Sequence, residues 1–203
     1  MPKISDEKRA ARRTQILEAA WSCFQAQGLH ATTMDDIIKA SGLSAGAVYS
    51  YFSGKDALIL AAVKTSLGDL QALLEPLLRE PPPSPGVFVE RVAAAVARFS
   101  ARDGYDLRRV ALLGWSEAQR NAQLRETMRG FYLAFRDRLA DAAALWKKAG
   151  ALGADASARD VAKTLLSAIL GFVVQSAIMD DVEPKDLARG LRDLGKGGNA
   201  DAG

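Results

Sequence analysis

Apolar residues recur at intervals of three and four along most of this chain, and that spacing places them on one face of an α-helix. The first such stripe begins at about Arg9 and ends at Gly28, because glycine readily adopts the conformation of a helix end. Its apolar face is formed by Ile16, Leu17, Ala20 and Phe24. Similar stripes fill the rest of the chain, and no segment is convincing as a strand. We therefore predict an all-α fold of about nine helices.

Two short helices are predicted between Thr32 and Lys55. Thr32 or Thr33 can cap the first of them. Asp35 or Asp36 then stands at the position that completes a capping box. An apolar face follows directly, so this helix has both a start signal and a surface to bury.

The second short helix follows Ser41-Gly42, where the glycine ends the first one. Ser44 can cap it, and it is predicted to run through Tyr49 to Phe52. Two short helices joined by a tight turn that contains glycine form the helix-turn-helix pattern. The second helix of such a pair is sized to enter the major groove of DNA.

A long helix is predicted from Asp56 to Leu78, opened by a second capping box at Ser53. Its apolar stripe continues from the edge of the short helices into the next region, so one rigid rod touches both. The run Pro81–Pro85 then breaks the chain. Ser84 can cap the following helix, and the last proline of the run can take its first position.

The remaining helices are predicted from their start signals and stripes. They begin at Asp106 after a turn at Arg102–Gly104, near Leu124, after Ser157, and at Pro184. The chain is glycine-rich from Gly195 onward, and we predict a disordered tail there. The predicted helix after Ser157 is apolar on more than one face, so we expect a partner subunit to cover it.

Composition limits the function classes. The chain has 203 residues with a formal net charge of +3, so it is not a polycation and DNA binding needs a local basic cluster. The N-terminal segment supplies one, formed by Lys3, Lys8, Arg9, Arg12 and Arg13. The same cluster is also typical of a solvated basic tail.

The chain has one cysteine, Cys23, so it cannot form an internal disulfide framework. The sequence shows no secretory signal pattern, and both observations favour the cytoplasm. We interpret Cys23 as a small buried thiol; a redox sensor is the alternative. The single histidine, His30, leaves little for imidazole catalysis or a metal site. We therefore expect no enzyme activity, catalytic residue, metal or cofactor. The uncharged stretch Thr164–Met179 is shorter than the roughly 20 residues of a spanning helix, so no membrane contact is expected.

The ordered set of residues from 13 to 58 resembles the N-terminal domain of TetR-family transcriptional regulators. The matching run is Ile16-Leu17-x-Ala19-Ala20-x3-Phe24-x3-Gly28, Thr32-Thr33, Asp36-Ile37, Ser41-Gly42-Leu43-Ser44-x-Gly46-x2-Tyr49-x-Tyr51-Phe52 and Lys55-x2-Leu58. Ile38 departs from it, since the family usually has alanine there, and the larger side chain implies slightly wider helix packing. The resemblance implies a DNA-binding domain at 1–54, an effector-binding and dimerisation domain at 55–195, and a disordered tail at 196–203.

The candidate DNA contacts have two sources. Position alone places Ala45, Gly46 and Ala47 at the start of the recognition helix, facing base edges, and Arg13 in the basic cluster. The resemblance implies that Tyr49, Tyr51 and Lys55 contact phosphates or base edges, and that Thr33 contacts a phosphate. Partial core packing is the alternative for both tyrosines. Because the leading residues are small, specificity would depend on thymine methyls, the basic arm and DNA shape.

One such unit would bind weakly, so we expect a homodimer that spans two half-sites of a palindromic operator, about 34 to 36 Å apart. The resemblance implies a four-helix bundle formed by the last two long helices of both subunits.

Aromatic residues of the middle helices form either solid core or a pocket for a small, largely apolar effector. The candidate pocket residues are Phe99, Trp115, Met128, Phe131, Phe135, Phe172 and Gln175, with Gln119, Gln123 and Arg136 as further polar partners.

The leading hypothesis is a ligand-responsive DNA-binding transcription regulator: a cytoplasmic, nucleoid-associated repressor that leaves its operator when it binds an effector. The alternative is a DNA-bound scaffold that recruits a protein and holds no ligand; a solid core with an exposed apolar patch would favour it. An enzyme or carrier with a vestigial motif is the third hypothesis.

Overall fold

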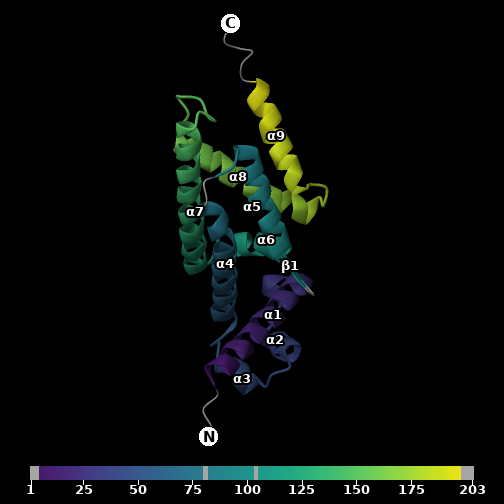
Figure 1. The fold of residues 1–203 in the computed structure, drawn as a ribbon. Helices are drawn as coiled ribbons and strands as arrows, with labels where there is room; N and C mark the ends of the chain where they lie inside the picture. Colours follow the sequence, from purple (N-terminus) through teal and green to yellow (C-terminus); the bar gives the residue numbers. More distant parts are fainter. Residues whose placement is uncertain (1–4, 80–81, 103–104, 198–203) are drawn as a thin grey trace. The chain divides into compact units, whose positions relative to one another are not determined.

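The computed structural model describes residues 5–79, 82–102 and 105–197 (Figure 1). Its helices are α1 Asp6–Ala31, α2 Met34–Ser41, α3 Ala45–Tyr49, α4 Lys55–Arg79, α5 Pro85–Ser100, α6 Leu107–Glu117, α7 Ala122–Lys148, α8 Ala158–Ile178 and α9 Pro184–Gly197. Over these residues the predicted all-α fold is confirmed. Two-residue strands, β1 Ala101–Arg102 and β2 Tyr105–Asp106, pair with each other, which the sequence pattern does not predict.

The chain divides into two compact units. One contains the residues up to Leu67 together with Arg102–Met128, and the other contains Gly68–Ala101 with the residues from Arg129 onward. Helix α6 therefore shares a unit with α1, α2 and α3, although the sequence places it beyond the expected boundary at residue 54. The assignment of DNA binding to 1–54 and of effector binding and dimerisation to 55–195 stays a prediction about function.

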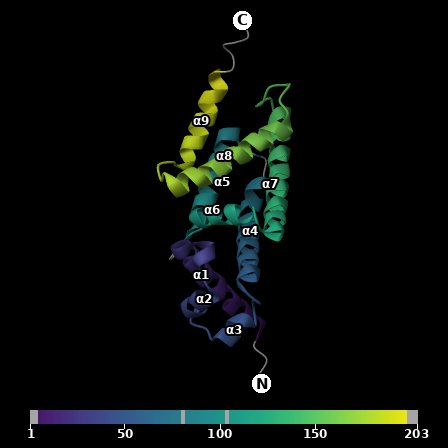
Figure 2. The same cartoon turned by 180° about the vertical axis from the view of Figure 1, so that it is seen from behind.

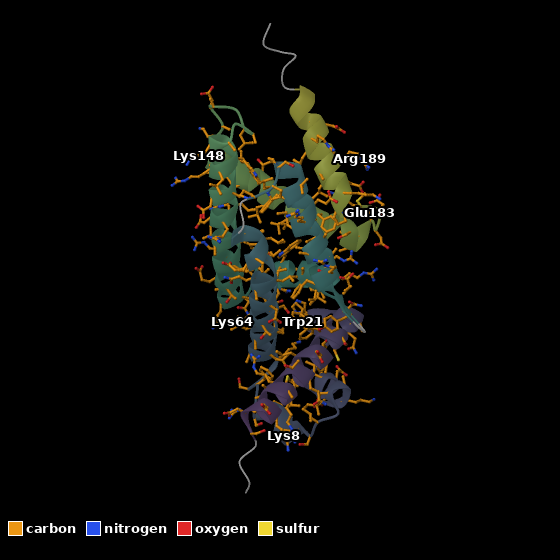
Figure 3. All side chains as sticks on the ribbon, viewed as in Figure 1. Lys8, Trp21, Lys64, Lys148, Glu183 and Arg189 are labelled. Atoms are coloured by element: carbon orange, nitrogen blue, oxygen red, sulfur yellow. The ribbon has the colours of Figure 1, made fainter. Side chains whose placement is uncertain are left out.

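In the first unit, α1 packs against α2 and α6, and α2 packs against α3 (Figure 1). Fully buried Ile16, Phe24, Ile37, Val48 and Leu58 form the centre of its core. These residues come from α1, α2, α3 and α4, so their burial holds the two short helices, α2 and α3, against the two long ones. Figure 3 labels Lys8 in the first turns of α1, where it is exposed, and Trp21 just past the middle of the helix, where it is buried.

In the second unit, α5 packs against α8 and α9, and Figure 2 shows α8 crossing α5. Phe88 is buried and meets Trp146 edge to face, with ring centroids 5.3 Å apart. The Trp146 Nε1–H donates to the Pro83 carbonyl at 2.6 Å, so the indole is both packed and hydrogen-bonded. A Cβ at Gly86 would lie 3.1 Å from the carbonyl oxygen of Ala188, so glycine permits the close approach of α5 and α9.

Several predicted helix ends are confirmed. Gly28 leaves the helical conformation with φ 81°, and a further turn of α1 follows it. The side chains of Ser157 and Asp106 cap α8 and α6. Pro85 takes the first turn of α5, although Ser84 makes no capping hydrogen bond through its side chain.

Other boundaries were wrong. Helix α1 begins at Asp6 rather than about Arg9, because Ser5 accepts a hydrogen bond from the Lys8 amide and caps it. Helix α3 ends at Tyr49 and not at Phe52. The Leu58 amide donates to the Gly54 carbonyl, so α4 starts one residue earlier than predicted.

Two predicted irregular segments lie partly outside the described residues. Helix α9 continues through Gly197, two residues past the predicted domain end at residue 195, and residues 198–203 of the predicted disordered tail lie outside the described residues. The same holds for Lys3 of the basic cluster and for the centre of the predicted turn at Arg102–Gly104.

Candidate nucleic-acid interface and effector pocket

Helix α2 is fixed at its first residue by a complete capping box. The Asp36 amide donates to Thr33 Oγ1 at 3.2 Å, and the Thr33 amide donates to Asp36 Oδ2 at 2.8 Å. The Thr33 hydroxyl also donates to Asp36 Oδ2, at 2.6 Å. Of the alternatives open in the sequence, Thr33 and Asp36 therefore form the cap. Thr32 is buried instead, and its hydroxyl donates to the Gly28 carbonyl at 2.7 Å.

The turn between α2 and α3 is stabilised by a glycine conformation and by two hydrogen bonds. Gly42 has φ 66°, a conformation that disfavours other residues. The Gln15 side chain on α1 donates to the Ser41 carbonyl at 2.7 Å, and the Ser41 hydroxyl donates to the Ile38 carbonyl at 2.9 Å. The angle between the two short helices is thus set by α1 and by the turn itself.

Helix α3 presents an outer surface of small residues. Val48 is its buried residue, whereas Ala45 and Gly46 are exposed and Ala47 is half-buried. Tyr49 is 49% exposed, so about half of the residue's surface is available to a partner. The residues predicted to face bases thus form an accessible surface, and base contact stays a prediction.

Two arginines of the basic cluster make contacts within the protein. Arg9 lies over the ring of Tyr51 with its guanidinium 5.9 Å from the ring centroid. Arg13 lies over Phe52 at 5.6 Å, and its Nη1 donates to Thr65 Oγ1 at 3.2 Å. Arg13 therefore helps to pack α1 against α4, while Arg9 and Tyr51 form a cation–π pair. Their predicted contact with phosphate is not tested by this arrangement.

Lys55, predicted as a phosphate ligand, holds the end of α1. Its Nζ donates to the carbonyls of His30 and Thr32, each at 3.0 Å. A lysine ammonium has three donors, so one remains for an anion. We interpret Lys55 as a residue that fixes the entry to α2, and its contact with phosphate stays a prediction.

The carboxylate of Asp36 gives this site a pH dependence. Hydrogen bonds from the Thr33 side chain and backbone lower the pKa of Asp36 below its usual value. A group whose pKa is lowered in the folded state stabilises the fold above its unfolded pKa, about 3.9, and that contribution is lost as the pH falls through the folded pKa.

Asp36→Asn is therefore expected to lower the melting temperature at neutral pH, with a difference from the parent that shrinks below about pH 4. Thermal melts of both proteins across this range measure the effect. Asp35→Asn, in the same turn but outside the capping box, is the matched control. A difference that is constant with pH would contradict this role.

Helix α6 is attached to α1 by polar contacts. The Gln25 side chain accepts a hydrogen bond from the Asp106 amide. Near the end of α1, His30 lies 3.4 Å from Glu117 Oε2. Burial acts to raise the pKa of Asp106, but hydrogen bonds from Arg108 outweigh it and the net pKa is lowered. These contacts fix the start and the end of α6 against the helix that carries the DNA-binding unit.

A partly open pocket of about 250 Å³ lies between the second half of α4 and α7, which run side by side (Figures 1 and 2). Its lining residues are Gln71, Leu74, Glu75 and Leu78 from α4, and Phe131, Ala134, Phe135 and Arg138 from α7. Each helix contributes positions i, i+3, i+4 and i+7, which is one helical face. The walls are therefore two apolar stripes that meet, with three polar side chains among them.

The predicted pocket residues separate in the structure. Phe131 and Phe135 line this pocket. Trp115 and Met128 belong to the other compact unit, and Phe172 is fully buried in the core. Phe99 and Gln175 are not among the lining residues.

The sequence prediction missed the four residues of α4, and it named Arg136 rather than Arg138 as the basic residue. The repeat of positions i+3, i+4 and i+7 from Phe131 would have indicated Arg138, because Arg136 lies on another side of α7. For Cys23, burial raises the pKa of the thiol, which disfavours the reactive thiolate form.

Two helices, Lys55–Leu78 in α4 and Ala158–Ile178 in α8, are long and apolar enough to cross a membrane by length and composition alone. Core helices of soluble proteins pass the same test, so this is weak evidence.

An exposed second helix in a helix-turn-helix, followed by a helical region, is typical of DNA-binding transcription regulators. Residues 16–62 match the family described as "Bacterial regulatory proteins, tetR family", and residues 85–193 match "BetI-type transcriptional repressor, C-terminal". The chain belongs to the TetR family of transcription regulators, and it is not an enzyme.

Individual relatives agree with this assignment. The chain is 26% identical over 178 residues to the regulator UidR of Escherichia coli strain K12, covering 87% of this chain and 84% of that protein. It is 28% identical to Salmonella enterica GusR, whose structure superposes with a TM-score of 0.72 over 95% of this chain and 96% of that one. A regulator from Saccharomonospora viridis, solved in complex with choline, shares the fold at 20% identity, with a TM-score of 0.74 over 93% and 97% of the two chains. The chain spans only about a third of the length of relatives from Bacillus subtilis and Mycobacterium tuberculosis.

Proposed function

We propose that this regulator is a ligand-responsive repressor, which binds a palindromic operator as a homodimer and leaves it when a small, largely apolar effector binds. The observation that supports DNA reading best is the outer surface of α3, where Ala45, Gly46 and Tyr49 are exposed on a helix anchored by Val48. A helix fixed from beneath with small residues outward can approach the floor of the major groove closely.

We place the dimer contact on α8 and α9. Helix α8 is strongly apolar, yet only 33% of its most apolar 18-residue stretch is buried within one chain. At the ends of these two helices Ile178, Met179 and Leu194 are 67%, 60% and 79% exposed. Apolar surface of this kind is typical of a subunit interface. A second copy would cover it and would supply the second recognition helix that a palindrome requires.

The effector site is proposed for the pocket between α4 and α7. Helix α4 begins directly after the helix-turn-helix and its second half forms one wall of that pocket. An effector that prefers a displaced α4 would shift the recognition helices away from their half-sites. A difference of roughly 1 to 3 kcal/mol in affinity between two states is typical of such coupling. The pocket favours this proposal over a scaffold that holds no ligand. The proposed location is the cytoplasm, at the nucleoid.

The test is a mobility-shift assay of the purified protein with promoter fragments across a range of salt concentrations. Tyr49→Ala is expected to weaken selective binding about tenfold or more, the effect of losing one hydrogen bond to a charged group. Its melting temperature should stay close to that of the parent, because Tyr49 is half exposed. Leu145→Ala, which truncates an equally exposed residue on α7, is the control. Binding that is not sequence-selective, or a Tyr49→Ala variant of unchanged affinity, would contradict the assignment.

A further inference from the structure

We propose that the pocket between α4 and α7 takes a small apolar carboxylate, and that the ligand's carboxylate binds the guanidinium of Arg138. This inference rests on the proposed function, in which the same pocket is the effector site. It adds the chemical class of the effector and the contact through which binding would act on α4.

The apolar part of the pocket sets the size of the ligand body. Phe131 and Phe135 are stacked, with ring centroids 6.4 Å apart and an interplanar angle of 19°. Leu74, Leu78 and Ala134 complete the apolar lining. A cavity of about 150 Å³ holds one benzene molecule. The pocket of about 250 Å³ therefore fits an apolar molecule of roughly ten non-hydrogen atoms.

Arg138 is the hydrogen-bond donor with spare capacity. Its Nη2 donates to the Leu78 carbonyl at 3.3 Å, which is a long hydrogen bond. Its other contacts are two ion pairs beyond hydrogen-bond distance, to Glu75 at 3.7 Å and to Asp141 at 3.8 Å. A guanidinium has five N–H groups in a planar fork that matches a carboxylate. A ligand carboxylate could accept two of them at normal distance, which neither acidic side chain does.

The remaining polar lining residues affect affinity in opposite directions. The Gln71 amide can donate a second hydrogen bond to the same carboxylate. Glu75 carries the same charge as the ligand and lies beside Arg138, so it competes for the guanidinium and repels the anion. Removing the charge of Glu75 should therefore strengthen binding. A cationic ligand would show the reverse dependence on both residues.

The same contact connects the ligand to α4. Both Leu78 and Glu75 belong to the last turns of α4, so Arg138 holds the end of that helix to α7. Pro76 has no N–H and removes one hydrogen bond within these turns. Arg138 is therefore a contact from α7 to the end of α4, in a stretch where α4 lacks one backbone hydrogen bond. A carboxylate that takes the guanidinium would loosen this attachment.

The experiment measures binding by isothermal titration calorimetry to the full chain. The probes are phenylacetate and octanoate, with phenylacetamide as the neutral isostere and 2-phenylethylammonium as the cation. We expect both carboxylates to bind and to be preferred over the other two probes. Arg138→Gln should weaken phenylacetate binding about tenfold or more, and Arg138→Lys should lie between it and the parent. Glu75→Gln should strengthen it several-fold. Circular dichroism melts of each variant check the fold, and Arg136→Gln is the matched control on α7.

Equal binding of phenylacetamide, preference for the cation, or a loss of affinity in Glu75→Gln would overturn the carboxylate assignment. So would the failure of both carboxylates to bind to a protein that still shifts DNA selectively, and in that case the DNA-binding proposal stands. If Arg138→Gln melts early, Glu75→Gln decides the question by the sign of its effect. A protein that binds phenylacetate through Arg138 but shows no selective DNA binding would instead overturn the proposed function.

Discussion

Replacing Phe24 by alanine is expected to destabilise the DNA-binding unit by about 3 to 5 kcal/mol, the usual cost of removing a fully buried phenylalanine. Phe24 has no exposed surface, and it meets Trp21 edge to face with ring centroids 5.9 Å apart. It lies on α1, which packs against both α2 and α6. The cavity would therefore open in the core, at the helix that packs against α2 and α6.

The measurement for Phe24→Ala is chemical denaturation followed by circular dichroism, together with the DNA mobility shift. Because domains are stable by only about 5 to 15 kcal/mol, this loss removes a large share of the unit's stability, so the unfolding midpoint should fall clearly and DNA binding should be lost at a lower temperature than in the parent. Tyr49→Ala removes an aromatic ring of the same unit that is half exposed, so it should leave the unfolding midpoint almost unchanged. A loss of less than about 1 kcal/mol in Phe24→Ala would contradict the packing described here.

The helix starts could be predicted because capping is local. A hydroxyl or carboxylate two or three residues before an amide either reaches it or does not, and Thr33, Ser157 and Asp106 show that it does. The start of α1 is also set by a local cap, Ser5, and the prediction placed it too late because it did not include this serine. The β1–β2 pair lay beyond prediction, because two residues carry no period-2 pattern.

The outer residues of the recognition helix could be placed from the sequence, but the partners of the basic residues could not. Whether Arg13 faces solvent or α4 depends on where Thr65 lies, 52 positions further along the chain. Lys55 likewise reaches carbonyls near residue 31 that helical periodicity does not bring close. Long side chains find partners through tertiary structure, so their roles remained open when only spacing was known.

The lining of the pocket also could not be predicted in full from the sequence. The aromatic residues of α7 were named as pocket candidates from the sequence, whereas the apolar stripe of α4 was interpreted as a rigid rod and its lining residues were not. One apolar face cannot show whether the opposing face fills it. Here the two stripes meet with Glu75 and Arg138 among them, and space remains between them. The position of a cavity thus depends on how two helix faces fit together, and the sequence of one helix does not determine that fit.

Replacing Val48 by aspartate is expected to abolish selective DNA binding, although Val48 itself cannot contact DNA. It has no exposed surface and is the buried residue through which α3 is anchored. An unpaired carboxylate there costs several kcal/mol, so α3 should detach while its outward residues Ala45, Gly46 and Tyr49 stay unchanged in sequence. Mobility shifts and hydrogen exchange of the α3 amides measure the two effects together. Val48→Thr keeps the shape of the side chain and should retain most of the binding. Parent-like DNA affinity in Val48→Asp would show that the position of α3 is not set by this contact.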